Sequence, residues 1–143
     1  MPEPTRAEAE RVLASAKTIG ENVTWRSESS RTPRWRFEAT VIGSSPLDVL
    51  KLCGFYGRKN WRFTLLMRQA PIRRFDFQYT DHRNPDRTII SQPHKHLWDD
   101  EQGNREVYVP DDIDITDVNR AFYDFLTECN IVLVGDYQSL VPF

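Results

Sequence analysis

Alternation of apolar and polar residues with a period of two dominates the middle of the chain. In residues 35–41 (WRFEATV), 61–67 (WRFTLLM) and 72–79 (IRRFDFQY), most second positions are apolar and the positions between them are mostly charged or polar. This pattern is typical of strands that bury one face. Weaker strand candidates are residues 22–28, 47–57, 87–92 and 105–109. Because parallel neighbours need helix-length crossovers, the short connections predict an antiparallel meander.

Helical spacing replaces this alternation at both ends of the chain. Residues 5–20 open with a capping box formed by Thr5 and Glu8, carry small apolar residues at helical spacing, and end at Gly20. This pattern predicts an N-terminal helix.

A broader apolar stripe runs along residues 115–130 and predicts a second helix that covers the sheet. Asp114 or Thr116 is expected to cap its start, and Asn130 to end it in the left-handed conformation. Residues 131–135 follow as a final short strand. The predicted fold is α+β: a curved antiparallel sheet of about six strands with an N-terminal helix and a C-terminal covering helix.

The length of 143 residues predicts a single domain, residues 1–143. The sequence has no apolar run of the roughly 20 residues that a membrane span needs, and its start lacks the layout of a signal peptide. We therefore expect a cytoplasmic protein that does not enter a membrane. The two cysteines, Cys53 and Cys129, have no metal-binding or disulfide-framework spacing, and we expect both to be reduced, buried thiols.

The net charge of -2 hides a marked asymmetry along the chain. Residues 26–95 hold 14 lysines and arginines against 6 acidic residues, whereas residues 96–143 hold 2 against 11. Eleven of those 14 cations are arginines, whose forked donors suit phosphate. Two interpretations remain open: the two regions neutralise each other across the fold, or the basic region binds a nucleic acid.

All three histidines lie within fifteen residues, His82 in a turn sequence and His94 and His96 in the motif PHKH. On an extended strand His94 and His96 would share one face, with Lys95 on the other. Pro93 would confine that strand to an edge or a bulge because it has no N–H to donate.

This grouping favours acid–base chemistry on RNA without a metal or other cofactor. One imidazole can remove the proton of a 2′-hydroxyl, a second can protonate the leaving 5′-oxygen, and cations can stabilise the charge on phosphorus. The candidate catalytic residues are His94, His96, Lys95 and His82. The candidate RNA-binding residues are Arg73, Arg74, Arg83, Arg87, Lys59 and Arg62. The rings of Trp35, Phe37, Trp61 and Phe63 are expected to point into the core.

A metal site is the competing interpretation of the same histidines. Two histidines on one strand face, with Asp76, Asp99 or Asp100 as a carboxylate ligand, would suit zinc or iron. The sequence has no HExxH motif or cysteine pair to support such a site, and the neighbouring cations would oppose a dication.

The order of these features resembles the TumE-like toxins of prokaryotic toxin–antitoxin pairs and neighbouring uncharacterised families with the same layout. The shared features are a strand containing RFDFQY, a turn containing DHRNP, the motif PHKH and a closing amphipathic helix, over roughly residues 60–130. The resemblance implies a compact ribonuclease toxin held silent by a cognate antitoxin protein. His94, Lys95 and His96 would be its site residues, with Arg74, Asp76 and His82 as companions. The strand-rich segment before residue 60 has no counterpart in that layout.

A function of another class also fits the sequence. A small protein with segregated charge can act as a non-catalytic inhibitor or binding module, of phage or host origin, that engages a nucleic-acid-handling complex. Its acidic face would include Asp111, Asp112, Asp114 and Asp117. The sequence leaves open the RNA target, the oligomeric state, and whether such a site cleaves RNA or transfers a group to it.

Overall fold

The computed structural model describes residues 3–28, 34–57, 60–77 and 117–140 in full, and between residues 78 and 116 it describes the backbone of four strands. In chain order the elements are α1 (Arg6–Ala14), β1 (Lys17–Ile19), β2 (Val23–Thr24), β3 (Arg26–Glu28), β4 (Arg34–Val41), the 3₁₀-helix η1 (Pro46–Asp48), β5 (Leu50–Tyr56), β6 (Trp61–Met67), β7 (Ala70–Phe77), β8 (His82–Arg83), β9 (Ile89–Ile90), β10 (His94–Asp99), β11 (Gly103–Tyr108), α2 (Val118–Glu128), β12 (Ile131–Leu133) and β13 (Tyr137–Gln138).

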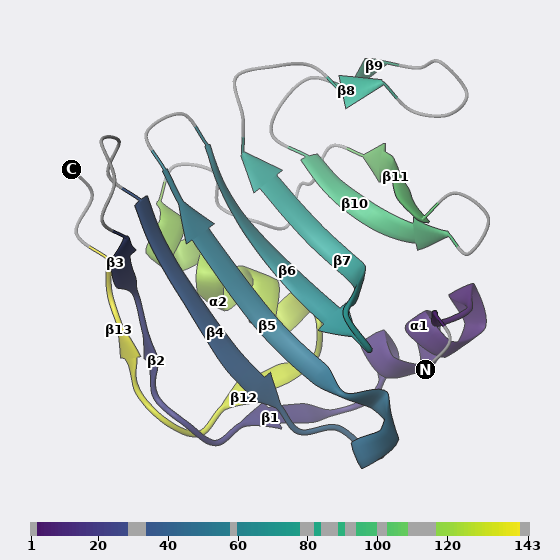
Figure 1. Cartoon of the computed structure of the whole chain (residues 1–143), viewed down its shortest axis with the longest axis horizontal. Coiled ribbons are helices and arrows are strands. Elements are labelled where there is room, and N and C mark those ends of the chain that lie inside the picture. The colour runs from purple at the N-terminus through teal and green to yellow at the C-terminus, as the bar shows by residue number, and fades with distance from the viewer. Residues whose placement is uncertain are drawn as a thin grey trace.

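The main sheet has seven strands in the order β11-β10-β7-β6-β5-β4-β3 (Figure 1). Every neighbouring pair in it is antiparallel. From β3 to β7 the strands are neighbours in chain order, as expected of a meander, and β10 joins β7 after the separate pair β8–β9. The α+β class and the antiparallel sheet with one helix near each end of the chain are confirmed. The sheet has seven strands where about six were predicted, and its curvature stays a prediction.

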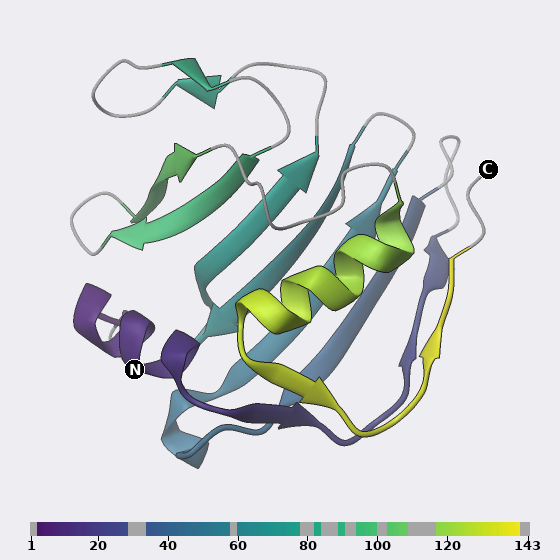
Figure 2. The ribbon, with the colours of Figure 1, turned by 180° about the vertical axis from the view of Figure 1, so that it is seen from behind.

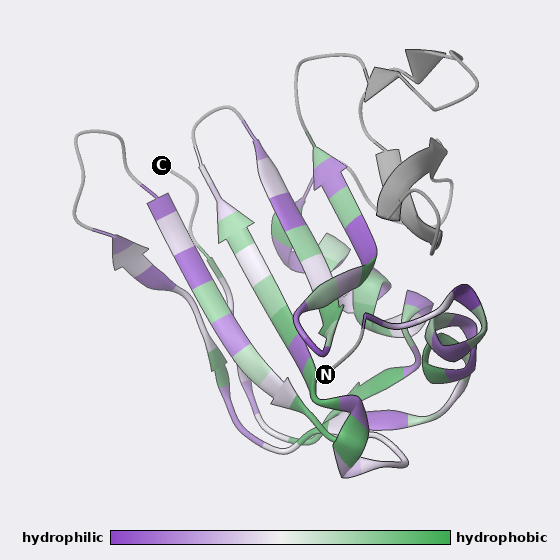
Figure 3. Cartoon of the chain, turned by 45° about the vertical axis from the view of Figure 1, so that its right-hand side comes forward, coloured by the Kyte–Doolittle hydropathy of each residue, from purple (hydrophilic) through white to green (hydrophobic). Residues whose placement is uncertain are grey.

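Helix α2 lies across one face of the sheet and completes the core (Figure 2). Phe122 and Phe125 are fully buried and contact the sheet rings, with centroid distances of 5.7 Å from Phe122 to Phe37 and 5.9 Å from Phe125 to Phe63. Alternating hydrophobic and hydrophilic bands run along β4 to β7 (Figure 3). The predicted inward rings are confirmed: Phe37, Trp61 and Phe63 are buried, and Trp35 is partly buried against the core.

The N-terminal helix is shorter than predicted. Its capping box is confirmed, with the backbone N–H of Glu8 donating to the Thr5 hydroxyl over 3.1 Å, but the helix ends at Ala14. Residues 17–19, which helical spacing had included, form β1 and pair in parallel with β12. Ile19 is fully buried as a strand residue, so its position at helical spacing did not indicate a helix.

The boundaries of α2 also differ from the prediction. Asp117, and not Asp114 or Thr116, caps the helix by accepting a hydrogen bond from the N–H of Asn119 over 2.9 Å. Asp114 and Thr116 lie outside the described residues. Asn130 adopts φ 57° after the helix, as predicted, and its side-chain amide donates to the carbonyl of Leu13 over 2.7 Å. The end of α2 is thereby bound to the end of α1.

Pro93 was expected to confine the histidine strand to an edge or a bulge, and the edge alternative is wrong. The pairing of β10 with β11 does contain a register irregularity, between Leu97 and Asp99. Strand β10 pairs with β7 on one side and with β11 on the other. Pro93 itself lies outside the described residues, and β10 begins after it, at His94. A proline that precedes a strand leaves the ladder intact, because none of the ladder hydrogen bonds needs its missing N–H.

A β-bulge determines which face of β7 carries its charged residues. The register on β6 shifts so that Leu65 lies opposite Arg73 and Leu66 lies opposite Pro71. The extra residue is Ile72. Ile72 and Phe75 are three positions apart and would face opposite sides of a regular strand, yet both are fully buried. The bulge thus restores the alternation that puts Phe75 inside and Arg74 outside.

Among the described residues, no helix is long and apolar enough to cross a bilayer.

Candidate nucleic-acid interface

A continuous row of residues crosses the outer face of the sheet, which is the face opposite α2. Because directly opposed residues of an antiparallel pair share a face, the register can be followed from strand to strand. The residues in direct opposition, from β3 to β7, are Arg26, Arg36, Phe55, Arg62 and Asp76, which we call the arginine row. The row combines three guanidiniums, one ring and one carboxylate.

Phe55 lies between two guanidiniums in the middle of the row. The Cζ atoms of Arg36 and Arg62 each lie 5.0 Å from the centroid of its ring. Such cation–π contacts contribute roughly 0.5–1 kcal/mol each at exposed sites. Phe55 is only 9% exposed although it is on the outer face, so the arginine stems shield a ring that would otherwise meet solvent.

Arg62 is a partly desolvated cation. Burial lowers its pKa from the ordinary value, with the nearby Arg74 and Arg36 adding to the effect and the carboxylate of Asp76 opposing it. The guanidinium still carries its charge at neutral pH. A cation that has already lost part of its hydration gives up less on binding a phosphate than a fully hydrated one does.

Asp76 and Arg74 form an ion pair at the β10 side of the row. The Nε of Arg74 donates to Oδ2 of Asp76 over 2.9 Å, and Asp76 is 0% exposed. Arg62 lies directly opposite Asp76 on β6. A buried carboxylate needs such partners, because burying an unpaired charge is costly.

The register of β10 brings two of the predicted catalytic positions to this pair. His94 lies opposite Asp76 and His96 lies opposite Arg74, whereas Lys95 lies opposite Phe75. The backbone thus agrees with the expectation that the two histidines alternate with Lys95. His82 lies elsewhere, opposite Ile90 in the separate two-stranded sheet of β8 and β9.

The predicted RNA-binding residues are distributed over several places. Arg62 and Arg74 are on the outer face, but Arg73 is on the face covered by α2 and forms an ion pair with Glu128. Arg83 lies opposite Ile89 in the β8–β9 pair. Lys59 and Arg87 lie outside the described residues.

Sequence reasoning missed Arg26, Arg36 and Phe55. The alternation in residues 35–41 does put Arg36 on the solvent side, so one signal was present. The opposition of Arg26, Arg36 and Phe55 depends on the register between strands, which the alternation of a single strand does not give.

Cys53 is half-buried beside the row, and burial, with Glu38 adding to it, raises the pKa of its thiol. A raised pKa disfavours the thiolate that a nucleophile or a metal ligand needs. Both cysteines are free; Cys129 is buried, as expected, whereas Cys53 is only half-buried.

No group of three or more metal-ligating side chains occurs among the residues whose side chains the structure describes. The β10 side chains do not belong to that set, so the metal interpretation of the histidines stays open. The nearest described partners of Asp76 are arginines, which would oppose a dication there.

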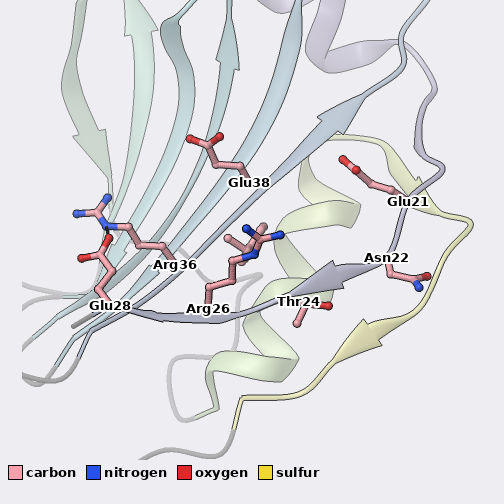
Figure 4. Close-up of a pocket in the computed structure, with 8 residues that line it drawn as sticks. Glu21, Asn22, Thr24, Arg26, Glu28, Arg36 and Glu38 are labelled. Carbon is pink, nitrogen blue, oxygen red and sulfur yellow. Dashed lines mark ion pairs between the residues drawn. The ribbon is translucent and has the colours of Figure 1, made fainter.

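A hollow of about 570 Å³ opens at the β3 end of the arginine row (Figure 4). Its lining residues are Glu21, Asn22, Thr24, Arg26, Glu28, Arg36, Phe37 and Glu38. The hollow lies where β4 lacks a neighbouring strand. Strand β3 pairs only with residues 34–36 of β4, and β2, which precedes β3, pairs with β13 instead of with β4.

No curated protein and no solved structure matches the chain. A family model does match, over residues 5–131. This segment contains the whole arginine row, the hollow and strand β10. The chain therefore belongs to DUF6978, a family of unknown function.

Proposed function

We propose that the protein is a small ribonuclease that binds RNA across the arginine row and cleaves it by metal-independent acid–base chemistry. The register of β10 on β7 is the observation that carries this proposal: His94 is opposite Asp76, and His96 is opposite Arg74. Opposed residues of an antiparallel pair share a face. Two imidazoles would therefore adjoin a carboxylate and a guanidinium at one end of a row of phosphate-binding groups.

The proposed reaction is an internal transesterification. One imidazole takes the proton of a ribose 2′-hydroxyl, and the resulting oxygen attacks the adjacent phosphorus. The second imidazole gives a proton to the 5′-oxygen as the P–O5′ bond breaks. The products are a 2′,3′-cyclic phosphate and a free 5′-hydroxyl. We assign the two proton transfers jointly to His94 and His96, because imidazole exchanges protons near neutral pH in either direction.

The described charges supply what the imidazoles lack. Arg74 and Arg62 would stabilise the negative charge that develops on the phosphoryl oxygens. Asp76 would orient the imidazole opposite it, as buried carboxylates do for catalytic histidines. Lys95 lies opposite Phe75, so in this proposal the arginines take over the role first expected of the lysine.

The cellular role in the proposal comes from the resemblance to TumE-like toxins. Cleavage of RNA would arrest growth, and a cognate antitoxin protein would hold the enzyme inactive in the cytoplasm. Expression of the chain without its genomic neighbour tests this part separately from the chemistry: growth arrest relieved by co-expression of the neighbouring gene is expected.

The deciding experiment incubates the purified protein with total RNA, with and without EDTA. We expect fragments with 5′-hydroxyl ends in both conditions, and a loss of at least about a hundredfold in rate in His94→Ala and in His96→Ala at unchanged melting temperature. His82→Ala is expected to keep the wild-type rate, because His82 lies in the β8–β9 pair outside the main sheet. A loss comparable to that of His94→Ala would add a third imidazole to the site. Full cleavage by His96→Ala, or loss of cleavage in EDTA, would contradict the proposal.

The binding-module alternative is supported by the solvent side of α2. Tyr123 is 50% exposed there, and a hollow of about 520 Å³ is lined by Asp117, Asn119, Arg120, Tyr123 and Asp124. A half-exposed tyrosine beside carboxylates suits contact with a basic protein surface. Intact RNA in the experiment above, together with capture of a nucleic-acid-handling complex that Tyr123→Ala abolishes, would favour this alternative.

A further inference from the structure

The hollow at the β3 end of the arginine row has the size of a small-ligand site. Its volume of about 570 Å³ lies within the range of ligand pockets. Phe37, a core ring that is 4% exposed, forms part of its lining. The remaining lining residues are charged or polar, and they come from the segment before β2, from β2, from β3 and from β4.

Several of the polar groups in the hollow already have partners that fix the walls. Glu28 and Arg36 form an ion pair of 2.5 Å (Figure 4). The carboxylate of Glu21 accepts a hydrogen bond of 2.6 Å from the backbone N–H of Thr40. Thr40 lies on the part of β4 with which β3 does not pair. These contacts hold the two sides of the hollow in place without a ligand.

Two charged groups of the lining remain available to a ligand. Arg26 is exposed and makes no ion pair or side-chain hydrogen bond with any residue in the described part of the chain. Figure 4 shows its side chain apart from the Glu28–Arg36 pair. Glu38 has only a long contact of 3.4 Å with Lys51, and both side chains are largely exposed. The hollow therefore offers one forked donor and one carboxylate acceptor.

We propose that this hollow binds a guanine base. Guanine presents two adjacent acceptors, O6 and N7, to a forked arginine, and its N1–H and N2–H₂ donors suit a carboxylate. Adenine replaces the O6 acceptor with an amino donor, and cytosine and uracil have no N7. Arg26 is the donor to O6 and N7, and Glu38 accepts from N1–H and N2–H₂. Guanidinium planes such as that of Arg36 stack on bases in single-stranded RNA.

The position of the hollow relative to the histidines suggests what guanine binding would do for cleavage. This part of the inference rests on the proposed ribonuclease function. His94 lies opposite Asp76, one strand beyond the end of the arginine row, so Arg26 and His94 are five interstrand spacings apart, which is about 24 Å. A guanine held by Arg26 would fix the register of an RNA strand that lies along the row. Cleavage would then occur a fixed number of nucleotides from that guanine.

Calorimetric titration of the intact protein with the four nucleoside monophosphates tests the inference without any cleavage. GMP is expected to bind roughly tenfold or more tightly than AMP, CMP or UMP. Arg26→Ala and Glu38→Gln should each remove that preference. Arg34→Ala is the matched control, because Arg34 is an exposed outer-face arginine on β4 that does not line the hollow; it should keep the preference.

The outcomes separate this inference from the proposed function. Preferential GMP binding that depends on Arg26, in a protein that leaves RNA intact, supports the guanine site and refutes the ribonuclease. RNA cleavage with equal or no binding of the four nucleotides refutes the guanine site and leaves the ribonuclease standing. A GMP preference that survives Arg26→Ala also overturns the inference, because the base would then bind elsewhere.

Discussion

The Nε atom of Arg74 lies 2.9 Å from Oδ2 of Asp76, and the two residues are separated by only one position on the same strand. Asp76 is 0% exposed, while the Arg74 side chain is 28% exposed. The carboxylate is thus taken out of water among arginines, and removing it would leave partly buried cations without their anion. Asp76→Ala is expected to lower the free energy of unfolding by about 3 kcal/mol, measured by urea denaturation.

Glu38→Ala is the control for Asp76, because the Glu38–Lys51 pair is exposed and should contribute less than about 1 kcal/mol. Equal losses in the two variants would contradict the view that Asp76 neutralises the buried end of the row.

The arginine row predicts a specific salt dependence of RNA binding. If Arg62 contacts one phosphate, Arg62→Ala should weaken binding of a single-stranded RNA and reduce the slope of log K against log salt by about 0.7. Arg6→Ala removes an exposed charge from α1, which is not part of the row, and should leave the slope unchanged. Fluorescence anisotropy at four or five salt concentrations measures both slopes. The same slope for Arg62→Ala and wild type would exclude a phosphate contact at this residue.

Gly54 is required by a close approach between β4 and β5. A Cβ atom at this position would overlap the ring of Phe37, which lies directly opposite. Gly54→Ala should therefore cost about 2 kcal/mol or more, since the ring is locked between Trp25 and Phe122 in the core. Gly20→Ala is the matched control, because a Cβ there meets no atom within 4 Å. Thermal unfolding of both variants checks this, and a Gly54→Ala protein as stable as Gly20→Ala would disprove the clash.

Lys17 predicts an increase in stability at alkaline pH. The residue is 1% exposed, its Nζ donates to the carbonyls of Val12, Leu13 and Ser15, and burial lowers its pKa to about 8. Between pH 8 and the unfolded value of 10.5 the unfolded chain binds more protons than the folded one. The Lys17 contribution to the free energy of unfolding should therefore rise across that window, by about 3 kcal/mol in all.

The comparison with Lys17→Met isolates this contribution, because burial raises the pKa of Cys53 and changes stability in the opposite direction in the same window. The difference between wild type and Lys17→Met, from urea denaturation at pH 7.5 to 10.5, should become steadily more favourable to wild type. Lys51→Met, at an exposed lysine, should show no such trend. If the difference in free energy of unfolding between wild type and Lys17→Met does not change with pH, the three carbonyls keep the amine charged in the folded protein across this range.

Tyr137 connects the C-terminal strand to α2. Its hydroxyl accepts from the indole N–H of Trp25 over 2.8 Å and donates to Oδ1 of Asn119 over 2.6 Å, and its ring stacks on Phe122 at 4.0 Å. Tyr137→Phe keeps the stacking but leaves the buried indole N–H of Trp25 without its acceptor, at an expected cost of about 1–3 kcal/mol. Oδ1 of Asn119 keeps a hydrogen bond from the N–H of Leu140 over 2.7 Å.

Burial also raises the pKa of Tyr137 to about 12. The unfolded phenol ionises near 10, so the contribution of Tyr137 to stability is complete below pH 10 and is lost between pH 10 and 12. Tyr137→Phe should unfold with a weaker pH dependence in that range, and an unchanged dependence would count against a protonated, buried phenol.

Much of the sheet could be predicted because the alternation of buried and exposed residues is visible within the sequence of each single strand. The alternation in residues 35–41 and 61–67 reports directly which residues face the core, and Phe37 and Phe63 are indeed buried. The left-handed Asn130 and the Thr5 cap follow from local backbone chemistry in the same way.

Pairing between distant strands could not be read in this way. The hairpin between β6 and β7 turns at Arg68 and Gln69, both with positive φ, although neither is a usual turn residue. Tertiary contacts hold that turn: Arg68 forms an ion pair with Glu8, and its N–H donates to the carbonyls of Asp48 and Val49. The neighbour of β10 and the opposition of Arg26 and Arg36 likewise depend on the whole assembly. Arg74 and Asp76 were named from the resemblance to TumE-like toxins, and Asp76 also as a possible metal ligand, but their opposition to His96 and His94 could not be derived from the alternation of a single strand.

The extra residue at Ile72 means that β7 can lose one residue more easily than it can gain one. Deleting Ile72 would turn the bulge into a regular ladder in which Leu65 still lies opposite Arg73 and Leu66 opposite Pro71. Phe75 would stay inside and Asp76 outside. Inserting one residue after Arg73 would instead shift the rest of the strand by one position relative to β6, and this shift would turn Phe75 and Phe77 toward solvent and Asp76 toward the helix.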